Sequence, residues 1–128
     1  GTNDLTRYVM SADRMLGSLA DLNTPWQPAV LRLLKIACDG AAASEKKSPV
    51  GVCGEAAADP ALAVVLVGLG VASLSMTSRA LADVDAVLKS VTREDCKRLA
   101  DIALACAEAE EARAAVRAEL PILEELGL

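Results

Sequence analysis

The hydrophobic pattern predicts a helix over residues 28–42. Pro28 suits the first position of that helix, because proline lacks the backbone N–H that would be unpaired there. The positions on its apolar face, which we expect to be buried, are Val30, Leu33, Leu34, Ala37 and Ala41. A shorter helical turn is predicted over residues 5–11. The intervening stretch contains Gly17 and Pro25, which break regular structure, so we expect an irregular loop there.

Two short apolar segments, each followed by a helical pattern, predict a parallel sheet. The segment VGVC at 50–53 precedes a helix that opens at Asp59-Pro60 and ends at Gly70. The segment SLSM at 73–76, which we expect to be a buried strand, precedes a helix capped by Thr77 or Ser78. The expected apolar face of this last helix is Leu81, Val84, Val87 and Leu88. A parallel sheet must be covered on both of its faces, which a unit with only two strands cannot achieve alone. We therefore expect the sheet to be incomplete.

After residue 90 the pattern is helical only. Thr92 and Asp95 resemble a capping box that opens a helix over 93–106. A last helix is predicted over 109–126, with a kink or break at Pro121. We therefore divide the chain into an α/β part, residues 1–90, and a C-terminal helical extension, residues 91–128, packed on it.

Composition narrows the class of protein. The chain is 53% hydrophobic but only 2% aromatic, with no Phe, which suits Ala/Leu/Val helices and short parallel strands. The net charge of −5 and the lack of basic runs argue against nucleic-acid binding. The apolar stretch at 61–76 is shorter than the roughly 18–20 residues of a membrane span and contains Gly and Ser, so we expect no membrane insertion.

The cysteines do not predict a zinc site. Cys38, Cys53, Cys96 and Cys106 show no CxxC spacing, and the sequence contains no His. No signal peptide is evident, so we expect reduced thiols and a cytoplasmic location.

Polar residues follow the predicted strands, at the edge where parallel α/β proteins place their sites. Cys53 to Glu55 follow one strand and residues 75–78 the next, and Asn3 and Asp4 lie where a strand before them would end. Other interpretations exist for each. Asn3 and Asp4 could cap a helix, Cys53 could be a small buried apolar residue, and Glu55 could lie in a solvated turn. Arg14 beside Asp13 could form an ordinary surface ion pair.

Four stretches together resemble a known family: GTNDLTRYVMSADR at 1–14, PWQPAVLRLLK at 25–35, PVGVCGEAAADP at 49–60 and LSMTSRAL at 74–81. They are similar to the C-terminal part of the phosphoenolpyruvate-utilising barrel enzymes. The likeness is greatest to enzyme I of the sugar phosphotransferase system, the phosphoenolpyruvate-protein phosphotransferases. The triplet at 12–14 and the run PAVLRLLK favour enzyme I over pyruvate phosphate dikinase or phosphoenolpyruvate synthase. The sequence departs from the family where Ala58 replaces a usual Gly and Leu74 a common Phe.

The resemblance implies a fold. The chain would be the C-terminal portion of a (β/α)8 TIM barrel, about its last two to three βα units, followed by a helical tail. A complete barrel takes about 250 residues, so we expect an incomplete, helix-rich barrel whose exposed strand edge is hidden by self-association or by refolding of its strands.

The resemblance also implies roles for individual residues. Asp4 would be one acidic ligand of an essential Mg²⁺, with the second acidic ligand outside this sequence. Asn3 would help to hold phosphoenolpyruvate, and Arg14 would pair with phosphate oxygens. Cys53 would be the acid that protonates the enolate carbon as pyruvate forms.

Partners follow from the same resemblance. The phosphoryl group would pass to a His on a separate N-terminal domain and then to the histidine phosphocarrier protein, in sugar uptake. Because this chain contains no His, we expect it to be inactive alone, and we expect a homodimer in the complete enzyme. Two alternatives stay open: a segment of a dikinase or synthase relative, and a non-catalytic self-association module.

Overall fold

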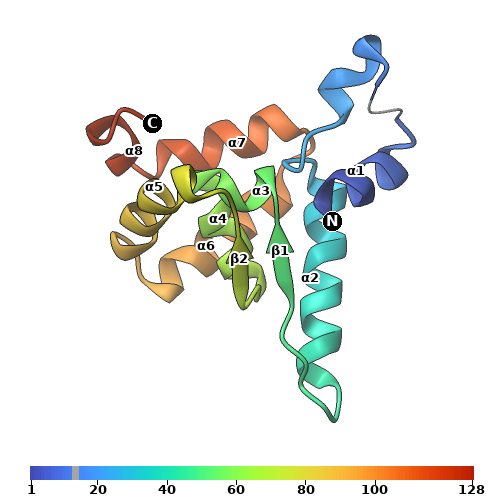
Figure 1. Cartoon of the computed structure of the whole chain (residues 1–128), viewed down its shortest axis with the longest axis horizontal. Helices are drawn as coiled ribbons and strands as arrows, with labels where there is room; N and C mark the ends of the chain where they lie inside the picture. Colours follow the sequence, from blue (N-terminus) through green and yellow to red (C-terminus); the bar gives the residue numbers. More distant parts are fainter. Residues whose placement is uncertain (13–14) are drawn as a thin grey trace.

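Helices dominate the computed structural model, which describes residues 1–12 and 15–128 (Figure 1). The helices and strands, in chain order, are α1 Thr2–Met10, the 3-10 helix η1 Gly17–Leu22, α2 Pro28–Ala43, β1 Gly51–Cys53, α3 Glu55–Ala58, α4 Pro60–Leu69, β2 Ser73–Ser75, α5 Ser78–Lys89, α6 Arg93–Ala105, α7 Ala109–Ala118 and α8 Ile122–Glu125. The predicted alternation of strands and helices over residues 50–89 is confirmed. The first helix begins three residues earlier than predicted, at Thr2.

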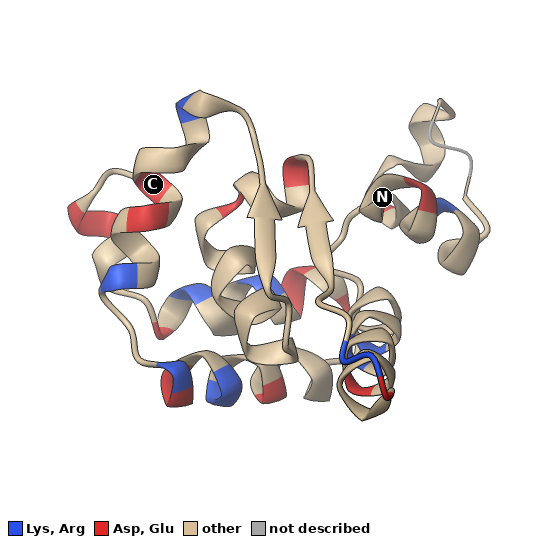
Figure 2. Ribbon diagram, turned by 60° about the horizontal axis from the view of Figure 1, so that its bottom comes forward, with Lys and Arg blue, Asp and Glu red and all other residues tan. Residues whose placement is uncertain are grey.

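The sheet consists of β1 and β2, paired parallel in the register Gly51 to Ser73, Val52 to Leu74 and Cys53 to Ser75. Val52 is buried, whereas Cys53 and its partner Ser75 are exposed on the opposite face. The prediction of a buried second strand is therefore wrong. Its outward positions carry serines, and no layer of the described chain covers that face. The helices α4, α6 and α7 lie behind the sheet (Figures 1 and 2).

Helix α4 is the centre of the core, with every residue from Ala61 to Leu66 buried. Such a helix, apolar on all sides, needs neighbours all round. Asp59 caps its N-terminus, as predicted, by accepting from the backbone N–H groups of Ala61 and Leu62 at 3.0 and 3.3 Å. Gly70 ends it at φ +106°, a backbone conformation that favours glycine.

Helix α6 approaches α4 closely at Gly68. A Cβ atom on Gly68 would overlap the backbone carbonyl oxygen of Cys96 and lie 2.8 Å from the Cβ of Ala100. Glycine is therefore required here by the space between the two helices and not by its backbone angles. The sequence pattern did not predict this contact, because a glycine inside a helical pattern ordinarily indicates only a lower stability of the helix.

Two predicted apolar faces are partly wrong. The buried residues of α2 include Val30, Leu31 and Leu34, whereas Leu33 is 41% exposed. Leu33 and the exposed Ile36 extend the apolar residues of α2 beyond its buried face, so periodicity alone selected the wrong edge of that face. Ala37, also predicted to be buried, is exposed. In α5, Val84 is buried as predicted but Leu81 is 52% exposed.

The C-terminal helices confirm their sequence signals. The side chain of Thr92 accepts from the backbone N–H of Asp95 at 3.1 Å, and the Asp95 carboxylate accepts from the backbone N–H of Thr92 at 2.9 Å. The predicted last helix is interrupted at Pro121, between α7 and α8. Buried residues of α6, α7 and α8 belong to the same apolar core as α2 and α4. The division at residue 90 stays a prediction.

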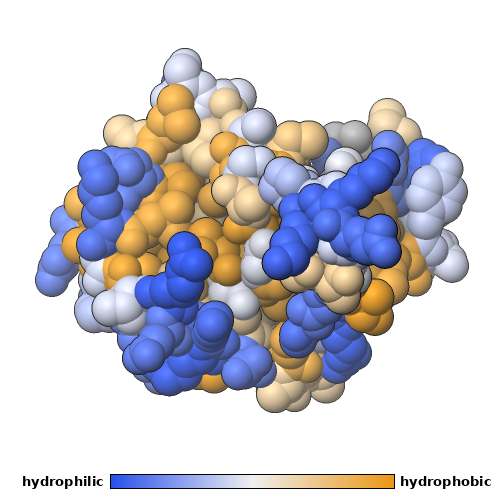
Figure 3. Space-filling model, turned by 90° about the horizontal axis from the view of Figure 1, so that it is seen from below, coloured by the Kyte–Doolittle hydropathy of each residue, from blue (hydrophilic) through white to orange (hydrophobic). Residues whose placement is uncertain are grey.

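The surface mixes charge with apolar side chains. Lys and Arg are interspersed with Asp and Glu along the ribbon (Figure 2). Seen from the end at which the strands begin, apolar surface extends between charged groups (Figure 3). Within residues 1–12 and 15–128, no helix combines the length and apolar content needed to cross a membrane.

Candidate functional site at the carboxyl ends of the strands

The two strands end level with each other. Cys53 and Ser75 are register partners, and the backbone N–H of Gly54 donates to the carbonyl oxygen of Ser75 at 3.0 Å. Both arrowheads point to the same edge in Figure 2. The prediction that Cys53 to Glu55 and residues 75–78 leave the sheet at a common edge is confirmed by this parallel pairing.

Cys53 is the exposed thiol of the chain, whereas Cys38, Cys96 and Cys106 are buried. The alternative that Cys53 is a small buried apolar residue is wrong. Burial raises the pKa of the Cys38 and Cys96 thiols, and the nearby carboxylates of Asp39 and Asp95 raise it further. Chemistry that needs an accessible thiol therefore has Cys53 available at the strand end.

A glycine joins Cys53 to the next helix. Gly54 has φ +88°, which allows the chain to turn directly from β1 into α3. Glu55, the first residue of α3, is exposed, while Ala56 and Ala57 are buried. The polar strand end is thus backed by small apolar side chains.

Asn3 and Asp4 lie in the first turn of α1. Gly1 is the N-cap, without a side-chain capping bond, so the alternative that Asn3 or Asp4 caps this helix is wrong. Asp4 is exposed, where a carboxylate interacts favourably with the positive end of the helix dipole, and Asn3 is half-buried. Figures 1 and 2 show the chain's first residues on the side of β1 away from β2, near the level of the strand ends.

Two predictions remain, Arg14 as a ligand of phosphate and the Mg²⁺ site. Arg14 lies outside the described residues. Among those that the structure describes, no three Cys, Asp or Glu side chains converge in a way that could hold a metal ion. Asp4, to which the resemblance assigned one carboxylate ligand of Mg²⁺, is exposed in the first turn of α1, and this role stays a prediction.

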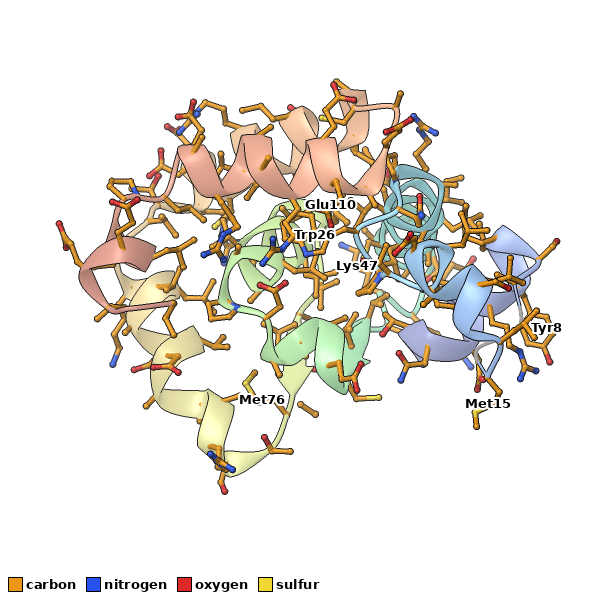
Figure 4. All side chains as sticks on the ribbon, turned by 90° about the horizontal axis from the view of Figure 1, so that it is seen from above. Tyr8, Met15, Trp26, Lys47, Met76 and Glu110 are labelled. Carbon is orange, nitrogen blue, oxygen red and sulfur yellow. The ribbon has the colours of Figure 1, made fainter. Side chains whose placement is uncertain are left out.

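One contact near the site was not predicted from the sequence. The indole Nε1–H of Trp26 donates to the carboxylate of Asp59 at 2.9 Å, across 33 residues of sequence. Trp26 is only 4% exposed. In Figure 4 it lies near the middle of the molecule, whereas Tyr8 and Met15 lie at the rim. The Asp-Pro pair predicted the helix cap, but periodicity could not predict its distant partner.

Comparison with known proteins identifies the family. Residues 1–93 match the family model described as "PEP-utilising enzyme, PEP-binding domain". The chain therefore belongs to the phosphoenolpyruvate-utilising enzymes, and the matched residues include both strand ends and α1.

Individual relatives are more specific. Over 120 residues, 94% of this chain, it is 51% identical to the phosphoenolpyruvate-protein phosphotransferase of Streptomyces coelicolor, of which it covers 21%. Over 111 residues, 87% of this chain, it is 40% identical to the enzyme of the same name from Bacillus sp. (strain S), of which it covers 19%. It is 44% identical over 114 residues, 89% of this chain, to the multiphosphoryl transfer protein of Xanthomonas campestris pv. campestris, with 13% of that protein covered. The chain thus spans about a fifth of the length of the phosphotransferases that it matches.

Proposed function

We propose that this chain supplies part of the substrate site of a phosphoenolpyruvate-protein phosphotransferase. The observation that carries the proposal is the level ending of β1 and β2, which leaves the thiol of Cys53 exposed beside Ser75. The similarity to phosphoenolpyruvate-protein phosphotransferases of Streptomyces and Bacillus, and to a multiphosphoryl transfer protein of Xanthomonas, supports this reaction over that of a dikinase or synthase.

The chemistry assigned to Cys53 is a proton transfer. When the phosphoryl group leaves phosphoenolpyruvate, the enolate of pyruvate remains. The S–H bond of Cys53 breaks, its proton forms the new C–H bond at the enolate carbon, and solvent later returns a proton to the thiolate. A thiol suits this step because its ordinary pKa lies closer to neutrality than that of a hydroxyl.

The remaining roles concern binding. Asp4 would supply one carboxylate to Mg²⁺, which when bound neutralises phosphate charge, and the other acidic ligand would come from outside this sequence. Asn3 would hold phosphoenolpyruvate, and Arg14 would bind its phosphate oxygens through its planar guanidinium. Asn3 and Asp4 directly precede Leu5, which packs against the main core. This anchorage would hold the first turn of α1 against the rest of the domain.

We further propose the barrel as the setting of the site. The exposed face of the sheet carries Gly51, Cys53, Ser73 and Ser75, small side chains that would suit the interior of a closed (β/α)8 barrel near its rim. Further strands would then pair with the open edges of β1 and β2, which two strands alone leave unsatisfied.

Partners would follow from that reaction. The acceptor would be a His outside this sequence, which itself has none, and the next acceptor would be the histidine phosphocarrier protein of sugar uptake. Homodimer formation and a cytoplasmic location belong to the same proposal. The exposed apolar side chains, among them Ile36 and Leu81, give self-association a physical basis.

A chimera tests the proposed function. The matching segment of the Streptomyces coelicolor phosphotransferase is replaced by this chain, and phosphoenolpyruvate-dependent phosphorylation of the phosphocarrier protein is measured. We expect the chimera to be active, to lose activity when Mg²⁺ is chelated, and to lose at least tenfold in rate with Asp4→Asn. A matched control is Asp85→Asn, on the exposed surface of α5. A folded but inactive chimera would contradict the proposal and favour a self-association module.

A further inference from the structure

The turn after Cys53 is held at its start and along its length. At its start, the backbone N–H of Gly54 donates to the carbonyl oxygen of Ser75. Inside it, Ala56 and Ala57 are 1% and 0% exposed and fix α3 in the core. Only five residues separate Cys53 from Asp59, so a displacement at Asp59 is passed to the strand end through a short, well-packed segment.

Asp59 accepts three hydrogen bonds with one carboxylate. Its Oδ1 accepts from the backbone N–H groups of Ala61 and Leu62, and its Oδ2 accepts from the indole of Trp26. Capping α4 requires only Oδ1. The bond through Oδ2 is therefore an additional connection, and it joins the turn to a different part of the chain.

Trp26 is itself held firmly. Its backbone N–H donates to the hydroxyl of Thr24 at 3.3 Å, Pro25 restricts the backbone before it, and Pro28 opens α2 two residues later. Its ring is buried in the main apolar core. A buried indole with a fixed backbone is a rigid reference point for the carboxylate that it binds.

From these contacts we infer that Trp26 and Asp59 are positioning residues that set the place of the Cys53 thiol through the 54–59 turn. The inference rests on the proposed role of Cys53 as the proton donor. Neither residue touches substrate; the pair acts by holding the turn. Misplacement of a reacting group by about 1 Å can lower a rate up to a hundredfold, so a modest shift has a measurable effect.

Two conservative variants test the pair in the chimera. Trp26→Phe keeps the aromatic ring but removes the N–H donor. Asp59→Asn keeps an oxygen to cap α4 but places an NH₂ group where the indole needs an acceptor. We expect each variant to lower kcat about tenfold with the KM for phosphoenolpyruvate unchanged, because proton donation follows substrate binding. The control is Thr92→Ala, which removes the side-chain cap of α6 and is expected to leave kcat unchanged.

The decisive arm repeats both variants in a Cys53→Ala background. If the pair acts through the thiol, neither substitution lowers the residual rate further. An undiminished tenfold effect there, or an equal effect of Thr92→Ala, would overturn the inference and indicate a general loss of stability. An unchanged rate in Cys53→Ala itself would instead overturn the proposed function. Wild-type kcat in both Trp26→Phe and Asp59→Asn, with Cys53→Ala impaired, would overturn the positioning role alone.

Discussion

The contact between α4 and α6 and the sheet of β1 and β2 differ in how complete they are. Helix α4 is buried along most of its length and meets α6 so closely that only glycine fits at position 68. The sheet has two three-residue strands, one exposed face and open edges. The difference indicates that the helical core stabilises this chain, whereas the strand end with Cys53 is free to carry chemistry.

The strongest way to break this comparison is Gly68→Ala. The added methyl group would overlap the backbone of Cys96, and backbone atoms cannot move aside without displacing α6. We expect the free energy of unfolding to fall by about 3 kcal/mol, as for severe overpacking, in urea titrations at several protein concentrations.

Gly40→Ala is the matched control. Gly40 lies in α2 with nothing within 4 Å of the added atom, so we expect a gain of about 0.5–1 kcal/mol from helix propensity. Equal effects of the two substitutions would show that the close approach of α4 and α6 contributes nothing.

A smaller effect is expected at the start of α6. Thr92→Ala removes the side-chain acceptor of the capping box and should cost about 1 kcal/mol. The measurement is again urea unfolding, and Thr77→Ala provides the comparison. Thr77 is the N-cap of α5 but makes no side-chain capping bond, so its replacement should cost less. A larger loss at Thr77 would contradict this account of the cap.

The same capping box predicts a pH dependence. The Asp95 carboxylate accepts a hydrogen bond from the backbone N–H of Thr92. This bond holds the pKa of the Asp95 carboxyl below its ordinary value of 3.8. The stabilisation by Asp95 is therefore fully present above that value and is lost as pH falls through the lower folded pKa. We expect the stability difference between wild type and Asp95→Asn to shrink as pH is lowered from about 5 to about 3. A difference that stays constant would contradict the assignment.

The thiols distinguish the two regions without changing stability. In the folded chain we expect an alkylating reagent at pH 7 to modify Cys53 first, because Cys38 and Cys96 are buried and burial raises their pKa. Mass spectrometry should find one modified cysteine in the folded chain and four after unfolding in urea. Early modification at Cys96 would show that the contact of α4 with α6 opens readily.

Local signals in the sequence predicted most element boundaries. Proline at the start of α2, Asp-Pro before α4, Gly70 after it and the Thr92–Asp95 box each act on their own backbone, so position alone suffices. The apolar face of α2 was partly wrong at Leu33, because which side of an apolar helix is buried depends on neighbours distant in sequence.

The same difference between local signals and contacts distant in sequence applies to the candidate site. The common edge of Cys53 and Ser75 was predictable, since successive βα units place their strands parallel. The bond from Trp26 to Asp59 and the close contact at Gly68 were not, because each joins residues that only the folded chain brings together.

Cys53→Ala in the chimera tests the central claim most directly, with transfer rate and unfolding measured on the same protein. We expect the rate of pyruvate formation from phosphoenolpyruvate to fall at least a hundredfold, about the contribution of a general acid. The urea midpoint should equal that of wild type, because the side chain of Cys53 is exposed. Cys106→Ala, which truncates a buried side chain, should leave the rate unchanged and lower the urea midpoint. Wild-type turnover in Cys53→Ala would contradict the account.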